Sequence, residues 1–593
     1  MVRSPLSGAA TAVSAVIVNQ RKALVRLLVL VSFGISPTAR AQLQDDPALR
    51  PIDPPLRLHG AGQLGESLDS LTPPPASAMA PAPASAALPT TRAVSLETVL
   101  VPLGFDLRGF KSLPDAELQA HYAPLVGKSV TLQQVADITQ LVNETYAARG
   151  FPTCFAVVPN QDLAGQIVRV QAVEGYVRDI LIEGDAGPLR ERILAIAGKA
   201  RDEHPLTRAT FDRITALLAQ LPGLKANLEI PRASTLEGAT VMKVKVSLSH
   251  FAVAPGMVQS GTSTRIGAGL QEKSLTRYGE QLTLSLFPSF GSAQDRLYAV
   301  GALLPVSNNG LALKLDASEI QVTPQNVPVG SGAVLTNERV VKKISVGLAF
   351  PLMLAPDRSV LASVSVYGTR DRNTYTNPQN DRSVQIRSEV RGVQTDLNAV
   401  GTFSSDSLRA GASVVHGLPD AGASQDFVGA APGLVPQQRL DFTKSIQNFT
   451  WVHAFDGTPV STVLSAYAQE TGHILPPSEQ VFFGGNRFAA GYPIGELIGD
   501  SGYAASLELG RDSYFNLSAL RFLRPYLAAD SAHVHANNVT LLHDTTISGA
   551  LGLRFGDTTR YTVDLSVGLP LGQLPAQGTN RPPHFNSNVQ VQF

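Results

Sequence analysis

The sequence predicts two small α+β modules followed by an all-β transmembrane barrel of about 16 antiparallel strands. Three observations predict this fold class: an alternating strand at the end of the chain, a repeated order of strands and helices in residues 94–250, and dense two-residue alternation from residue 251 onward. A lipid-facing sheet cannot keep open edges, because unpaired backbone groups find no water in the bilayer. The strands are therefore expected to close into a ring.

The last nine residues alternate between two faces. Phe585, Ser587, Val589, Val591 and Phe593 share one face, and only amide side chains stand on the other. An apolar outer face with a polar inner face is typical of a strand in a lipid-embedded barrel. Phe593 is expected to serve as the assembly signal that the barrel-assembly machinery of the cell recognises.

Composition narrows the function classes. The 593 residues carry a formal net charge of zero, so no steering toward nucleic acid is expected. After the N-terminal region, no continuous apolar run reaches the roughly 18 residues of a membrane helix. The single cysteine, Cys154, excludes an intrachain disulfide and is expected to be a small buried apolar residue.

Residues 1–41 are predicted to be a secretory signal peptide. Arg21, Lys22 and Arg26 precede an apolar run, and an Ala-x-Ala site follows, with cleavage expected after Ala41. Residues 42–93 are rich in proline and alanine and cannot bury enough apolar surface to fold, so an extended linker is expected. Export combined with a barrel indicates the outer membrane of a Gram-negative bacterium.

The first module, residues 94–175, is predicted to have the order strand, helix, helix, strand, strand. Its first helix is expected to open at Ser112, with Asp115 at the capping-box position. The second helix is expected to begin at Thr131, because Gln134 follows three residues later, and to end at Gly150. The strands are expected at 101–110, 151–158 and 167–173.

The second module, residues 176–250, repeats this order. Its second helix carries Phe211, Ile214, Leu218 and Leu221 on one face. Its strands are expected at 176–183, 226–230 and 242–248, and its helices at 189–197 and 207–221. A repeat of roughly 75 residues is a small α+β module used twice.

A motif in the first module is similar to a known family. Pro159, Gln161, Leu163 and Gly165 form a Pro-x-Gln-x-Leu-x-x-Gly pattern, and a Val-Glu-Gly follows at 173–175. The pattern resembles the first polypeptide-transport-associated (POTRA) domain of two-partner secretion transporters, which export filamentous haemagglutinin and haemolysins. The resemblance implies two periplasmic POTRA domains, with substrate recognition near these four residues.

Residues 251–593 are predicted to form the barrel. Tight turns are expected at Asn309-Gly310, Asp456-Gly457 and Gly556-Asp557. Long polar segments at 321–338, 370–382 and 418–437 are expected to be external loops. A soluble β-sandwich also alternates, but its apolar face would point inward and it would leave the signal peptide and terminal aromatic unexplained.

One segment of the barrel is similar to the long loop that folds back into the lumen in this superfamily. Its motif residues are Ala490, Gly491, Tyr492, Asp500 and Gly502. In the family, an arginine stands where this chain has Ala490. That arginine pairs with an aspartate on a nearby strand.

The acidic partner of the loop tip is expected to be Asp530, within the strand at 526–532. Arg487, three residues before Ala490, is a candidate for the missing cation. An aspartate in a wet lumen can also stay hydrated, so pairing is not obligatory.

The resemblance implies export, with or without activation, of a large unfolded exoprotein such as a haemolysin or adhesin, received through its N-terminal secretion domain. Outer-membrane lipid surrounds the barrel in this prediction. No catalytic motif, cofactor site or metal site is expected; His533 and His535 share a face but lack a third ligand in the spacing. An outer-membrane protein insertase and a passive porin remain alternatives.

Overall fold

The computed structural model describes residues 97–593 except 160, 162, 164, 234, 261–262, 289–295, 329–333, 430–437, 486–487, 518–519, 539, 542, 558–559, 576–579 and 592–593. The predicted signal peptide and linker lie outside the described residues. Among the described helices, none is both long and apolar enough to cross a membrane.

The first module places two helices against a three-stranded sheet whose order is β2-β5-β4. β2 and β5 run parallel, and β4 pairs with β5 in antiparallel fashion. Cys154 is buried in the core of this module, as predicted. Its elements are β1 (Val99–Leu100), β2 (Gly104–Arg108), α3 (Asp115–Tyr122), β3 (Val130–Thr131), α4 (Leu132–Ala148), β4 (Phe155–Val157) and β5 (Ile167–Val173).

Of the two helix starts predicted in this module, the structure confirms one and contradicts the other. Thr131 forms the predicted capping box: its side chain accepts from the Gln134 amide, and the Gln134 side chain accepts from the Thr131 amide. The prediction for Ser112 was wrong, because α3 begins at Asp115 and has no side-chain cap. The Ser112 amide instead donates to the carboxylate of Glu174 at 2.7 Å.

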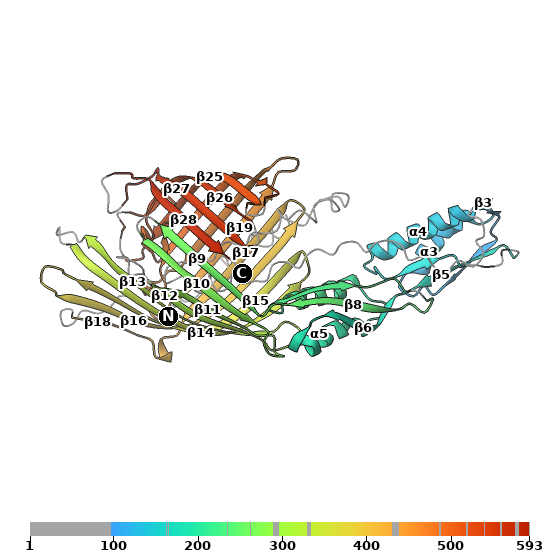
Figure 1. Cartoon of the computed structure of the whole chain (residues 1–593), viewed down its shortest axis with the longest axis horizontal. Helices are drawn as coiled ribbons and strands as arrows, with labels where there is room; N and C mark the ends of the chain where they lie inside the picture. Colours follow the sequence, from blue (N-terminus) through green and yellow to red (C-terminus); the bar gives the residue numbers. More distant parts are fainter. Residues whose placement is uncertain are drawn as a thin grey trace, which may run out of the picture. The chain divides into compact units, whose positions relative to one another are not determined.

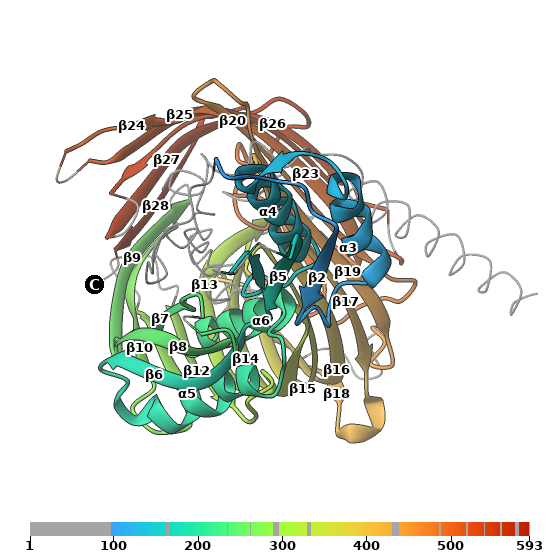
Figure 2. The same ribbon diagram turned by 90° about the vertical axis from the view of Figure 1, so that its right-hand side faces the viewer.

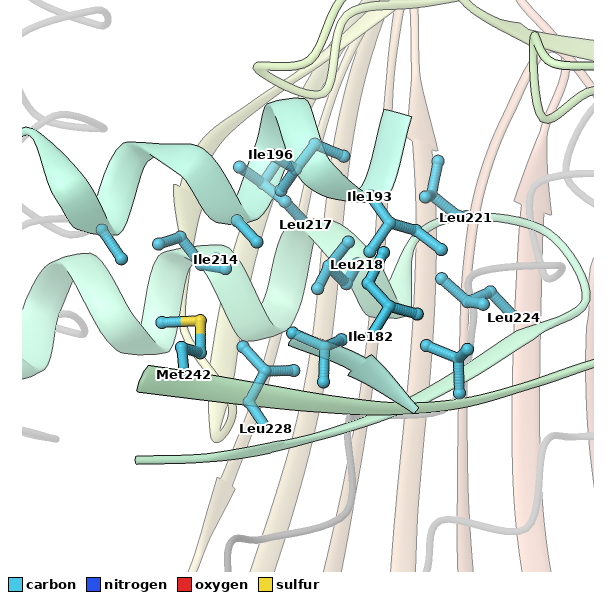
Figure 3. Close-up of a cluster of buried hydrophobic side chains, with 14 of the residues drawn as sticks. Ile182, Ile193, Ile196, Ile214, Leu217, Leu218, Leu221, Leu224, Leu228 and Met242 are labelled. Atoms are coloured by element: carbon cyan, nitrogen blue, oxygen red, sulfur yellow. The ribbon is translucent and has the colours of Figure 1, made fainter. Parts of the chain in front are cut away.

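The second module repeats the architecture with a larger core. Figure 3 shows Ile193 and Ile196 from α5 meeting Ile214, Leu217 and Leu218 from α6 above the sheet. The sheet order is β6-β8-β7. The elements are β6 (Tyr176–Gly184), α5 (Arg190–Ala197), α6 (Arg208–Ala219), β7 (Leu224–Glu229) and β8 (Ala239–Leu248).

The rest of the chain forms a closed antiparallel barrel, drawn as a ring of green to red strands in Figures 1 and 2. Within the described residues it has 16 long strands, as predicted, with the short β18 (Ser424–Val428) and β24 (Ser513–Tyr514) added along the ring. The ring closes where β28 pairs with β9. The long strands are β9 (Phe251–Ser260), β10 (Ser263–Lys273), β11 (Gln281–Phe287), β12 (Arg296–Pro305), β13 (Ala312–Pro328), β14 (Val334–Leu354), β15 (Arg358–Thr376), β16 (Ser383–Phe403), β17 (Asp406–Gly417), β19 (Thr443–Ala454), β20 (Val460–Glu470), β23 (Ser501–Arg511), β25 (Phe522–His535), β26 (Thr545–Gly556), β27 (Tyr561–Pro570) and β28 (His584–Val591).

Side chains alternate between lumen and exterior along these strands. On β25, Arg524 and Asp530 are buried inside, whereas Leu527 on the opposite face is 61% exposed. Leu551 on β26 is 64% exposed in the same way. The barrel therefore offers lipid an apolar wall and keeps its polar groups inside.

Three strands run far beyond the thickness of a bilayer. β14, β15 and β16 contain 21, 19 and 21 residues, whereas about 9–11 residues suffice to cross the membrane. The polar segments at 321–338 and 370–382 were expected to be loops, but most of their described residues belong to β13, β14 and β15. Those expectations were wrong, because a polar strand outside the lipid loses the apolar alternation that identifies it.

The second module contacts the turns at one end of the barrel. The Arg192 guanidinium donates to the carbonyls of Tyr278, Pro305 and Ser307 at 2.7, 3.0 and 2.9 Å. Leu354, at the end of β14, packs against the apolar core of the module. The module is thus fastened to short turns of the barrel by both polar and apolar contacts.

Candidate functional site

A hairpin between β20 and β23 packs on the inner wall of the barrel. Its two short strands, β21 (Val481–Phe483) and β22 (Leu497–Gly499), pair with each other in a sheet separate from the barrel. Val481, Phe483 and Leu497 pack against inward side chains of the wall, including Ala504 and Val534. The predicted lumenal loop therefore lies against the inner face of β20, β23 and β25.

The base of this hairpin is fixed by Asp500, which is fully buried. Its carboxylate accepts from the amides of Leu475 and Asn537, at 2.9 and 2.8 Å, and from the Gln480 side chain at 3.2 Å. Gly502 follows closely, and a Cβ there would lie 2.7 Å from the carbonyl oxygen of His533. These two predicted motif residues hold the base of the loop rather than its tip.

A buried ion pair adds a second attachment. Lys444 on β19 lies 3.0 Å from the carboxylate of Glu479, and the two side chains are 4% and 7% exposed. Lys444 also donates to the Glu479 carbonyl at 2.8 Å. Separating the two side chains would leave an uncompensated buried charge. The ion pair is therefore expected to keep its geometry. Sequence reasoning missed both residues.

The tip of the hairpin contacts strands close to the barrel seam. The Ala490 amide donates to Asp530 on β25 at 3.3 Å, and the Ala490 carbonyl accepts from Asn586 on β28 at 3.0 Å. The Tyr492 hydroxyl donates to the carbonyl of Gln573 at 2.7 Å, and Tyr492 is fully buried. The expected meeting of the loop tip and Asp530 is present, with a backbone amide in the place of an arginine side chain.

Two glycines allow the tip to approach the wall. A Cβ on Gly568 of β27 would lie 2.2 Å from the Ala490 carbonyl oxygen, and one on Gly491 would lie 2.5 Å from the Leu569 carbonyl carbon. Neither position has room for a side chain, because atoms this close overlap. The tip sequence Ala-Gly-Tyr therefore packs directly against the backbone of β27.

Asp530 is only 6% exposed and also accepts from Ser548 on β26 at 2.5 Å. Among the described residues, no cation is paired with it. Arg487, the candidate substitute cation, lies outside the described residues, and so does Phe593. Both remain sequence predictions.

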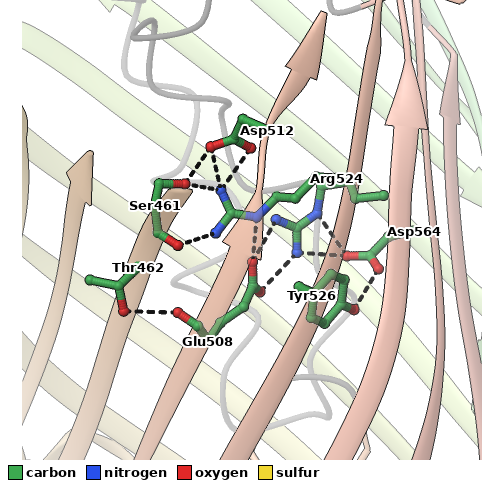
Figure 4. A network of polar contacts seen from close by, with 8 residues as sticks. Ser461, Thr462, Glu508, Asp512, Arg524, Tyr526 and Asp564 are labelled. Carbon is green, nitrogen blue, oxygen red and sulfur yellow. Dashed lines mark hydrogen bonds and ion pairs between the residues drawn. The ribbon is translucent and has the colours of Figure 1, made fainter. Parts of the chain in front are cut away.

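A network of charges, drawn in Figure 4, crosses the inner wall along β23, β25, β26 and β27. Arg524 contacts Glu508 and Asp512 at 2.9 and 3.0 Å. Arg554 contacts Glu508 and Asp564 at 3.2 and 2.9 Å. Two cations thus bridge three carboxylates near the same barrel end as the second module. Sequence reasoning missed this network, since its members belong to strands whose register it could not supply.

In the POTRA-like motif of the first module, Gln161 has a structural role. The Gln161 side chain donates to the Arg169 carbonyl at 2.9 Å and accepts from the Arg169 amide at 2.6 Å. It pairs with β5 as a neighbouring strand would, beyond the point where β4 ends. Leu163 packs against the core of the module.

Comparison with known proteins agrees with these features. Residues 102–175 match the model of the POTRA domain, ShlB-type, and residues 347–555 match that of the haemolysin secretion/activation protein ShlB/FhaC/HecB. The chain is 22% identical over 483 residues to the outer membrane transporter CdiB of Escherichia coli O6:K15:H31, which covers 78% of this chain and 77% of that protein.

Solved structures share the fold. CdiB from Escherichia coli aligns over 95% of this chain and 100% of its own, with a TM-score of 0.63 and 19% identity. BamA from Haemophilus ducreyi lacking POTRA domains 1–3 aligns over 83% and 99%, with a TM-score of 0.52 and 14% identity. The fold alone therefore fits both kinds of protein, and the family models distinguish them. The chain therefore contains a POTRA domain of the ShlB type and a domain of the haemolysin secretion/activation proteins ShlB/FhaC/HecB, and it is homologous to CdiB, which supports an outer-membrane transporter of two-partner secretion.

Proposed function

We propose that this transporter passes one large exoprotein through its barrel as an unfolded chain, with both modules in the periplasm. The observation that carries this proposal is the unequal attachment of the lumenal hairpin. Its base is held by a buried ion pair and three hydrogen bonds to Asp500. Among the described residues, its tip is held by hydrogen bonds and close packing alone.

Such a loop can yield at the tip while its base stays in place. A neutral hydrogen bond at the tip contributes on the order of 1 kcal/mol and the bond to the Asp530 carboxylate about 1.5–3 kcal/mol, whereas removing one partner of the buried pair at the base would cost about 3–5 kcal/mol. A polypeptide entering from the modules would need only to displace Ala490-Gly491-Tyr492 from β27. A barrel of about 16 strands leaves an aqueous interior wide enough for an extended chain.

The modules would receive the N-terminal secretion domain of the exoprotein. Both contain three-stranded sheets with edges that could accept an added strand through main-chain hydrogen bonds. The fastening of the second module to the barrel turns by Arg192 would deliver the bound segment to the lumen. The four motif residues of the first module remain the proposed recognition region.

The secretome of a strain lacking this chain tests the proposal. Loss of one large secreted or surface protein, restored by the wild-type chain, is the expected result. A general fall in outer-membrane barrels would instead indicate an insertase, and an unchanged protein profile with altered solute uptake would indicate a porin. Either of those outcomes would overturn the proposal.

A further inference from the structure

The outer surface of β14, β15 and β16 changes abruptly from apolar to basic. Val346 and Val366 face outward and are 48% and 55% exposed, in register with each other. Four residues farther along each strand, away from the end that carries the second module, the outward positions are Lys342 and Arg370, whose side chains are 57% and 69% exposed. The apolar wall therefore ends at a belt of cations.

An aromatic side chain marks the level of this change. Tyr298 on β12 faces outward, is 38% exposed and pairs with Glu319, which in turn pairs with Lys342. Tyrosines are enriched where a barrel leaves the hydrocarbon and meets the lipid head groups. Lys342 and Arg370 thus lie at head-group height.

The positive charges of these cations are not fully neutralised by carboxylates of the protein. Lys342 stands directly opposite Arg370, and Arg372 directly opposite Arg387. Like charges opposite each other on neighbouring strands are destabilising. Glu319 and Glu389 relieve the first pair, at 2.9 and 3.0 Å.

The repulsion within the second pair, Arg372 and Arg387, is less well compensated by carboxylates. Arg372 is exposed and has no ion pair or hydrogen bond among the described residues. The Nε of Arg387 donates to Gln385, a neutral partner. Arg391, one step toward the lipid, shares Glu389 with Arg370. At these positions the five cations of β14, β15 and β16 face three carboxylates, the third being Asp426 opposite Arg387; a fourth carboxylate, Glu338, lies one row farther out, opposite Thr374.

We propose that this basic patch, made of Lys342, Arg370, Arg372, Arg387 and Arg391, binds the phosphate groups of a glycolipid head group in the outer leaflet. The inference rests on the proposed orientation, which turns this end of the barrel away from the periplasm. Successive outward positions on a strand are about 6.8 Å apart, so the two rows can hold separate phosphates of one head group. Arginine binds phosphate through two parallel hydrogen bonds, which suits Arg372 and Arg387.

The binding test uses the purified full-length chain in phosphatidylcholine vesicles that contain lipid A bearing two phosphates. Bound lipid A is quantified after extraction of the purified protein, across a range of lipid A contents. The double variant Arg372→Gln/Arg387→Gln is expected to bind about 30-fold more weakly than the wild type, since each basic residue near a membrane surface contributes roughly fivefold. The matched control Arg358→Gln/Arg511→Gln removes two exposed cations at the opposite barrel end and is expected to bind like the wild type.

Further measurements make the outcome decisive. Lipid A without phosphates, and phosphatidylglycerol at equal charge, should each bind far more weakly; equal binding of either would overturn the proposal. Inorganic phosphate bound to the chain in vesicles free of lipid A would also overturn it. Retention of the heat-resistant, compact gel band shows that each variant is folded. Secretion of the partner is scored separately, so failure of lipid binding is distinguishable from failure of the export function.

Discussion

The tip of the lumenal hairpin is held by the Asp530 carboxylate through a backbone amide that any residue except proline could supply at position 490. The backbone amide of Ala490 donates to one carboxylate oxygen and the Ser548 hydroxyl to the other. These bonds need an acceptor oxygen rather than a negative charge. Among the described residues, the tip therefore meets Asp530 through a main-chain contact, where the family resemblance implies an arginine side chain.

Substitutions at Asp530 separate a need for an acceptor from a need for charge. Asp530→Asn keeps an acceptor oxygen for Ala490, so secretion is expected to stay within about threefold of the wild type. Asp530→Ala leaves a buried amide and hydroxyl unpaired, at a cost of about 1–3 kcal/mol, and should sharply reduce secretion. If both variants failed equally, charge pairing would be required, and Arg487 would become its first candidate. A double-mutant cycle of Arg487 and Asp530 would then measure their coupling, which additivity would exclude.

Gly568 can be tested as the seat of the tip. The Gly568→Ala variant would put a Cβ 2.2 Å from the Ala490 carbonyl oxygen, so the tip should leave the wall. Single-channel recordings in planar bilayers should show a larger fraction of open time than the wild type. Gly269→Ala, where the nearest atom is 3.9 Å away, is the matched control. Unchanged gating in Gly568→Ala would contradict this assignment of the tip.

Cys154 illustrates a residue whose chemistry is suppressed by its surroundings. Burial raises the pKa of its thiol to about 11, so the reactive thiolate is scarce at pH 8. Iodoacetamide should label native protein about 100-fold more slowly than protein in urea. Ala147→Cys, exposed on α4, supplies a reference for an accessible thiol. Rapid labelling of native Cys154 would show that the core of the first module opens readily.

At the scale of elements, the Gln161 side chain completes the sheet of the first module. It pairs with both backbone groups of Arg169 on β5, where β4 no longer reaches. Gln161→Ala should expose this edge and destabilise it by about 1 kcal/mol. Faster hydrogen exchange at 167–171 in the full chain would report the change, with Gln140→Ala on the exposed face of α4 as control. Equal exchange in the two variants would argue against a structural role for the motif.

Local signals predicted the elements best where one short segment decides the outcome. The capping box at Thr131 lies within four residues, and the structure confirmed it. The start of α3 depends instead on Glu174, 62 residues after Ser112, which accepts from the Ser112 amide. No local pattern at Ser112 could reveal that partner.

At the scale of the whole molecule, closure and strand number were predictable from alternation, whereas the polar interior was not. Glu508 joins Arg524 and Arg554 on two different strands, and Lys444 meets Glu479 from 35 residues away. These contacts depend on the register and tilt of neighbouring strands, which alternation leaves undetermined. The family resemblance supplied the loop tip and Asp530 only because both lie in short motifs.

The joint between the second module and the barrel depends on Arg192. Its guanidinium donates to three carbonyls on two separate barrel turns, and no single lysine ammonium can reproduce that planar set of donors. Arg192→Ala should weaken the joint by about 2 kcal/mol, since these are hydrogen bonds from a charged donor. Hydrogen exchange should rise at 274–280 and 306–311 while the barrel itself remains folded.

Arg190→Ala, an exposed neighbour without a partner among the described residues, should leave both turns unchanged. If the turns exchanged equally in the two variants, the joint would be held by its other contacts, among them Leu354 with the module core and Lys199 with the Asn308 carbonyl, rather than by Arg192. If the turns exchange faster only in Arg192→Ala, a fall in secretion in that variant alone would show that export needs the module held against the lumen.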